Sequence, residues 1–96
     1  MLHNQFALDR STELLRAVDH PLRIAILGLI ATKGPIKVND LINELKLNQA
    51  LTSQQLKILR DVSLISYIKE KTQVYYSINL RKLDILESAL ENFFNK

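Results

Sequence analysis

The 96-residue sequence predicts a mainly α-helical fold of about five helices with one small, two-stranded β-hairpin. Apolar residues recur at the spacing of an α-helix along most of the chain. That spacing gives way to β-branched and aromatic residues only in residues 66–78. A chain of this length, in which 47% of residues are apolar, is typical of one folded domain. Residues 1–96 are therefore assigned to a single domain.

Two helices are predicted before residue 34. The first covers approximately Phe6 to Val18, where apolar residues recur at helical spacing: Leu8, Leu14, Leu15 and Val18. The second runs from Pro21, a residue favoured in the first helical turn, to Ala31, with His20 or Asp19 just outside it. Because this second helix is apolar on almost every side, we expect it to be the buried central helix. Gly28 is expected to pack closely against a neighbour.

The next segment predicts two helices joined by a short turn. After the break at Gly34-Pro35, a helical i, i+3, i+4, i+7 pattern is complete, with Val38, Leu41, Ile42 and Leu45. Residues 46–48 form a short connection, and Asn48 is a suitable N-cap for a fourth helix. So short a connection forces the two helices to cross steeply, as in a helix-turn-helix.

The fourth helix has one apolar and one polar side. Leu56, Leu59 and Val62 point toward one side, and the opposite side collects short, amide or charged residues, namely Ala50, Ser53, Gln54, Lys57 and Asp61. Gln55 lies toward the apolar side, so we expect it to make a structural hydrogen bond and not to contact a ligand.

A β-hairpin follows this helix directly. Two β-prone segments, Ser66–Glu70 and Gln73–Ile78, are separated by the polar pair Lys71-Thr72. A helix that can enter the DNA major groove, followed by a charged hairpin that can lie along the backbone, is the arrangement of a winged helix-turn-helix. The sequence predicts this fold.

A last helix is predicted from the N-cap Asn79 to about Phe94. Its apolar stripe contains Leu83, Leu86, Leu90 and Phe93. A core of this size cannot cover the whole stripe, so we expect it to pack against Leu8, Leu14 and Leu15 of a second copy in a homodimer. Phe93 and Phe94 could alternatively pack within one chain.

The composition excludes several function classes. Cysteine is absent, which excludes disulfides, thiol catalysis and thiolate metal sites. Two isolated histidines, His3 and His20, and two glycines assemble no catalytic group or phosphate loop, so we expect neither enzyme activity nor a cofactor. A net charge of +3 permits a polyanionic partner without requiring one. Neither a signal peptide nor a membrane-length apolar run is visible, and a cytoplasmic location with no membrane partner is expected.

Three motifs resemble the ArsR/SmtB family of regulators. Residues 17–27, AVDHPLRIAIL, are similar to the family's A-x-x-HP-x-R-x-x-IL opening. Residues 47–60 resemble its recognition helix, including the S-x-x-L-x-x-L-R core, and residues 64–67 and 74–76 resemble its wing. The resemblance spans about Val18 to Ile78. It implies a homodimeric winged helix whose first and last helices form the interface, acting mostly as a repressor released by a signal.

The chain departs from that family at its sensing positions. Metal-sensing members carry cysteine, aspartate, histidine or glutamate where this chain has Lys37, Leu80, Lys82, Phe93 and Lys96. None of these residues can hold zinc or a softer metal, so no metal site is expected. In the wing, Lys71 stands where a glycine is usual, Thr72 where an arginine is common, and Ser63 replaces the glycine before the hairpin.

We therefore predict a metal-independent regulator, in the first place a repressor, that binds an inverted repeat in double-stranded DNA as a homodimer. Its major-groove residues are predicted to be Gln49, Ser53, Gln54 and Lys57, and its phosphate contacts Lys69 and Lys71. The altered wing leaves one alternative open, a winged helix that binds another protein and has lost DNA binding.

Overall fold

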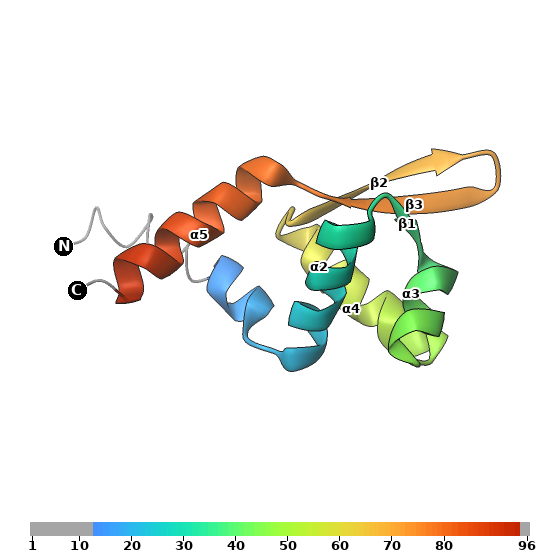
Figure 1. The fold of residues 1–96 in the computed structure, drawn as a ribbon, viewed down its shortest axis with the longest axis horizontal. Coiled ribbons are helices and arrows are strands. Elements are labelled where there is room, and N and C mark those ends of the chain that lie inside the picture. The colour runs from blue at the N-terminus through green and yellow to red at the C-terminus, as the bar shows by residue number, and fades with distance from the viewer. Residues whose placement is uncertain (1–12, 95–96) are drawn as a thin grey trace.

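The computed structural model describes residues 13–94, and side chains to residue 92. In chain order it contains a helical segment at 13–18, α2 (Pro21–Lys33), β1 (Ile36–Lys37), α3 (Val38–Leu45), α4 (Gln49–Asp61), β2 (Ile65–Glu70), β3 (Gln73–Ile78) and α5 (Leu80–Phe94) (Figure 1). This confirms the predicted helical fold with a wing. His3, Leu8 and Lys96, and the side chain of Phe93, lie outside the described residues.

Polar side chains begin three of the helices, as the sequence predicts. The Nδ1 atom of His20 accepts a hydrogen bond from the Leu22 amide at 3.2 Å. The Oδ1 atom of Asn48 accepts one from the Leu51 amide at 2.7 Å, and that of Asn79 accepts one from the Lys82 amide at 3.4 Å. These acceptors satisfy amides that have no partner within their own helix.

The wing is part of a three-stranded antiparallel sheet in the order β1-β3-β2. In the hairpin, Tyr67 pairs with Tyr76 and Glu70 with Gln73, which leaves the predicted two-residue turn at positions 71 and 72. On the other edge, Ile36 pairs with Tyr76. The third strand was absent from the prediction of a two-stranded wing, because two residues are too few to show a strand periodicity.

The core lies where α2, α3, α4 and the sheet meet. Its largest fully buried side chains, each less than 2% exposed, include Ile26, Ile30, Leu41, Leu56, Leu59 and Leu64. The apolar side predicted for α4 is therefore the side that anchors it, and the opposite side of α4 is turned outward.

Two expectations for α2 are wrong within one protomer. Only Ile26 and Ile30 of this helix are buried, and Ile24 is 56% exposed. Gly28 is also exposed, and a Cβ atom added to it would have no neighbour within 4 Å. The close approach occurs instead at Gly34, where a Cβ would lie 2.5 Å from the Ile30 carbonyl oxygen. One side of α2 thus remains open.

The last helix, α5, leaves the end of β3 and extends away from the sheet and α4 (Figure 1). None of the described helices combines the length and the apolar character that a membrane crossing requires.

Candidate nucleic-acid interface

The polar side of α4 is exposed along its length. Gln49, Ser53, Gln54 and Lys57 are all exposed, whereas Leu56 and Leu59 are buried. Burial of Leu56 and Leu59 turns that side of α4 toward the core, and the exposed side chains project outward. Ser53, Gln54 and Lys57 lie on this outward surface, whereas Gln49, exposed in the first turn, is seven residues before Leu56 and lies on nearly the same side of the helix as that residue.

The turn before α4 sets the angle at which the helix leaves the core. Lys46 ends α3 in the left-handed conformation with φ 54°, and the Leu47 amide donates a hydrogen bond to the Ile42 carbonyl at 3.0 Å. This closes the last turn of α3 and reverses the chain within three residues. Thr52 adds a local hydrogen bond at 2.8 Å from its hydroxyl to the Asn48 carbonyl. These short-range contacts close the turn that joins α3 to α4.

One of the residues predicted to contact DNA, Lys57, forms an ion pair within the free protein. The ammonium of Lys57 lies 3.0 Å from the Oδ2 atom of Asp61, one helical turn along α4. Both side chains are well exposed, so solvent screens this ion pair and its net contribution to stability is small. A polyanion approaching α4 would meet a cation that is neutralised locally.

Gln55 is a polar residue of α4 that lies on the buried side of the helix. It is only 6% exposed, and its Oε1 atom accepts a hydrogen bond from Nη1 of Arg23 at 2.9 Å. This confirms the expectation of a structural hydrogen bond. The partner, 32 residues away in sequence, could not be identified from local patterns.

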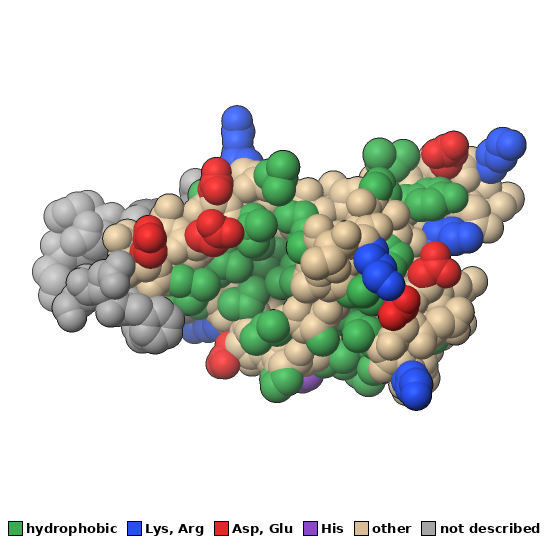
Figure 2. Space-filling view, viewed as in Figure 1, with side chains coloured by type: hydrophobic (Ala, Val, Ile, Leu, Met, Phe, Trp, Pro, Cys, Tyr) green, Lys and Arg blue, Asp and Glu red, His purple; other side chains and the backbone are tan. Residues whose placement is uncertain are grey.

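The wing carries the remaining basic residues. Lys69 in β2 and Lys71 in the turn are both exposed, and Figure 2 shows basic side chains at the tip of the hairpin. Lys71 adopts φ 58° and Ser63, before β2, adopts φ 62°. These left-handed conformations favour glycine. In this chain, a serine and a lysine adopt these conformations instead of glycine.

An arginine–aromatic contact joins α4 to the wing. The guanidinium carbon of Arg60 lies 5.4 Å from the centroid of the Tyr67 ring, and the Tyr67 and Tyr76 rings are 6.1 Å apart. Arg60 was not among the predicted site residues. Its pairing with Tyr67 requires the hairpin to fold back on the end of α4, and no sequence spacing indicates that.

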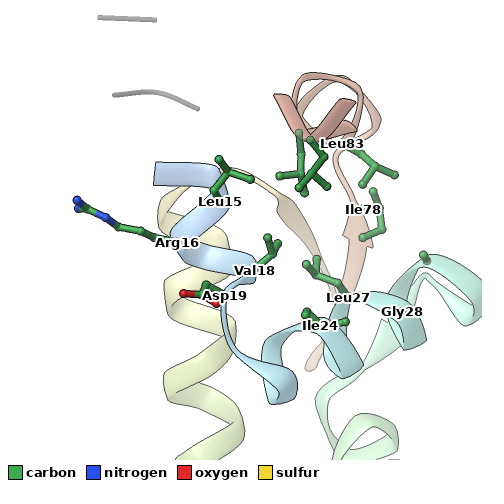
Figure 3. Close-up of a pocket in the computed structure, with 12 residues that line it drawn as sticks. Leu15, Arg16, Val18, Asp19, Ile24, Leu27, Gly28, Ile78 and Leu83 are labelled. Atoms are coloured by element: carbon green, nitrogen blue, oxygen red, sulfur yellow. The ribbon is translucent and has the colours of Figure 1, made fainter. Parts of the chain in front are cut away.

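The residues predicted for a dimer interface occupy two environments. Leu14 and Leu86 are already buried within one protomer. Leu15, Leu83 and Leu90 line an open groove of about 760 Å³ between the 13–18 segment, α2 and α5, together with residues such as Ile24 and Leu27. Figure 3 shows Leu15, Val18, Leu27 and Leu83 turned toward one another, with Arg16 pointing away. Hydrophobic side chains also gather between α5 and the rest of the protomer in Figure 2.

The positions that would carry metal ligands have other environments. Lys37 is the N-cap residue of α3, Leu80 is 73% exposed at the start of α5, and Lys82 lies in the first turn of that helix. Over the part of the chain that the structure describes, no three His, Cys, Asp or Glu side chains come close enough to hold an ion.

The sequence is similar to those of known transcriptional regulators. Residues 20–67 match the model of a family described as "Bacterial regulatory protein, arsR family". The chain is 27% identical over 90 residues to the HTH-type transcriptional regulator YgaV of Escherichia coli, covering 94% of this chain and 91% of that protein. It is 31% identical over 78 residues to the transcriptional repressor PagR of Bacillus anthracis, covering 81% and 78%.

Solved structures of similar proteins share the fold. The crystal structure of NolR from Sinorhizobium fredii superposes with a TM-score of 0.79 at 25% identity, covering 96% of this chain and 91% of that one. The crystal structure of PagR gives a TM-score of 0.75 at 29% identity, covering 88% and 97%.

Proposed function

Because the chain belongs to the arsR family of bacterial regulatory proteins, we propose that it is a metal-independent repressor that binds an inverted-repeat operator as a homodimer. The observation that carries the proposal is the exposed polar face of α4, flanked by a short helix-turn-helix connection and a basic wing. The named relatives are a transcriptional regulator and a transcriptional repressor, a class without enzyme activity.

The chemistry of the α4 face suits base recognition. Gln49 and Gln54 each offer an amide that can donate to and accept from adenine in the major groove, and Lys57 can donate to guanine or to a phosphate. Ser53 can accept or donate. Lys69 and Lys71 on the wing supply charge without sequence preference, and we assign them to the phosphate backbone.

Independence from metal rests on the residues that occupy the family's ligand positions. The Lys37 and Lys82 ammonium groups repel a cation, and the side chain of Leu80 has no donor atom. Phe93 and Lys96, which complete the set, lie outside the described side chains. A signal that releases this protein from DNA is therefore proposed not to be a zinc or arsenic ion.

Dimerisation is supported by apolar surface that one protomer leaves open. Ile24 and Ile85 are 56% and 42% exposed, and the groove between α2 and α5 has an almost entirely apolar lining. Burying a leucine or isoleucine side chain is favourable by about 1.5–3 kcal/mol, so a second copy that covers this surface would be stabilised. We place the interface on the 13–18 segment and α5, through Leu15, Leu83 and Leu90, with Leu8 and Phe93 proposed to extend it.

Selection from a random-sequence duplex library tests this function. A two-fold dimer places two copies of α4 about one helical turn of DNA apart, roughly 34 Å. The purified wild-type protein, without added metal, is expected to enrich an inverted repeat whose half-sites are about 10 base pairs apart, centre to centre. A pool that stays random after repeated rounds would contradict the proposal and favour the protein-binding alternative.

A further inference from the structure

Arg23 occupies an unusual place for a cation. It lies in the first turn of α2, whose amide dipoles give that end of the helix a partial positive charge, and no acidic residue stands in the same turn. The side chain is half-buried. A half-buried arginine at the positive end of a helix needs compensating acceptors, and the structure supplies three.

Two of these acceptors are backbone carbonyls at the end of the 13–18 segment. Nε of Arg23 donates to the Ala17 carbonyl at 2.5 Å, and Nη2 donates to the Arg16 carbonyl at 3.3 Å. The last carbonyls of a helix have no N–H donor within that helix, and they carry its partial negative charge. Arg23 therefore caps the helical segment that precedes α2.

The third acceptor lies on α4. Nη1 of Arg23 donates to Oε1 of Gln55 at 2.9 Å, and Gln55 is directly followed by the fully buried Leu56 and preceded by the exposed Gln54. Across residues 13–92, this is the one hydrogen bond between a side chain of α4 and a side chain of another element. Leu56 and Leu59 hold α4 through apolar packing, which tolerates small rotations better than a directional hydrogen bond does.

We propose that Arg23 is a positioning residue for DNA recognition. By joining the end of the 13–18 segment to Gln55, it fixes the rotation of α4 and hence the direction in which Gln54 and Lys57 project. The planar fork of the guanidinium reaches three acceptors on two elements at once, which the single ammonium of a lysine does not. This inference rests on the proposed function, because the residues that Arg23 orients are the proposed base contacts.

The test is a double-mutant cycle on DNA affinity. Arg23→Met, Gln55→Met and the double variant are titrated against a duplex carrying the inverted repeat recovered by selection and against a scrambled duplex of equal composition. All measurements are made well below the melting temperature of each variant, so that the protein is folded. Each single variant is expected to lose about tenfold in affinity for the inverted repeat with little change for the scrambled duplex, which Lys69 and Lys71 still bind. The double variant is expected to lose no more affinity for the inverted repeat than the single variant that binds it less tightly.

Two further variants separate positioning from general stability. Gln55→Glu retains an acceptor for Arg23 and is expected to keep near wild-type discrimination between the two duplexes. Lys33→Met removes another cation of α2, one that pairs with Glu44 on α3 at 2.7 Å, and should leave discrimination unchanged. If Arg23→Met melts earlier but discriminates as the wild type does, Arg23 is only structural and the inference is overturned. If the wild type itself does not discriminate, the proposed function fails instead.

Discussion

Lys57 and Asp61 form an ion pair of 3.0 Å on the exposed side of α4, the surface proposed to enter the major groove. The pair neutralises the single lysine that the predicted groove residues contain. A carboxylate beside the DNA also repels the phosphates. Lys57 therefore adds little net positive charge to the exposed side of α4 in the free protein.

Replacing Asp61 by Asn is expected to strengthen DNA binding. The change frees Lys57 and removes one repulsive charge, which should raise affinity about threefold to tenfold at low salt and less at high salt. Loss of the i, i+4 pair should cost only about 0.3–0.5 kcal/mol of stability. Fluorescence anisotropy with a labelled duplex measures the affinity. Asp84→Asn on α5 is the matched control, and an equal gain in that variant would show that only net charge matters.

Gln54 and Lys69 should differ in what they contribute to binding. Gln54→Ala is expected to cost about 1–3 kcal/mol on the selected inverted repeat and little on a scrambled duplex, because a base contact is lost. Lys69→Ala should weaken binding to both duplexes alike and flatten the salt dependence by about two units, because each protomer of the dimer loses one phosphate contact. Equal effects of the two variants on both duplexes would contradict the assignment of the groove and backbone contacts.

Ser63 is expected to be replaceable by glycine with a gain in stability. A non-glycine residue at φ 62° is strained, and relief of that strain should exceed the entropic cost of glycine by about 0.5–1 kcal/mol. Ser66→Gly in β2 serves as the control, since its backbone is extended and the same change there should cost about 0.5–1 kcal/mol. Urea denaturation gives both values; destabilisation by Ser63→Gly would mean that its side chain makes a compensating contact.

Leu90→Asp should split the proposed dimer. Two aspartates would be buried near one two-fold axis without a neutralising cation, which is strongly unfavourable. Analytical ultracentrifugation at micromolar concentration is expected to show a dimeric wild type and a monomeric variant, with weaker DNA binding. Leu80→Asp places the same charge on α5 outside the groove lining and should stay dimeric. A monomeric wild type, or a dimeric Leu90→Asp, would place the interface elsewhere.

Zinc is expected to leave DNA affinity unchanged. The residues at the family's ligand positions, among them Lys37 and Lys82, cannot coordinate the ion. Isothermal titration calorimetry should detect no stoichiometric site, and at most weak binding near His3. Stoichiometric binding at micromolar affinity or tighter, accompanied by release of DNA, would overturn the proposed metal independence.

Much of this fold follows from local patterns. The N-cap side chains of His20, Asn48 and Asn79 act within their own helical turns, so the sequence shows them directly. The outward face of α4 is equally visible, because helical periodicity places Ser53, Gln54 and Lys57 opposite the buried leucines.

The features that escaped prediction depend on contacts between distant residues. The strand β1 exists because Ile36 and Lys37 pair with Tyr76 and Tyr75, which are 40 and 38 positions further along the chain. The Arg23–Gln55 hydrogen bond likewise joins α2 to α4. Gly28 was expected to pack closely because glycine is costly inside a helix, but it lies on the open side of α2. Hydrophobic periodicity and helix or strand propensity are local properties, and they do not show which distant residues come into contact.

The salt dependence of binding to duplex DNA tests the central claim most directly. If the two wing lysines of each protomer in a dimer contact phosphates, four phosphates are neutralised, and log K should fall with log salt with a slope of about −4. The inverted repeat from the selection should give this slope without added metal. A slope near zero, or no binding at low salt, would contradict a DNA-binding function and favour a winged helix that binds protein.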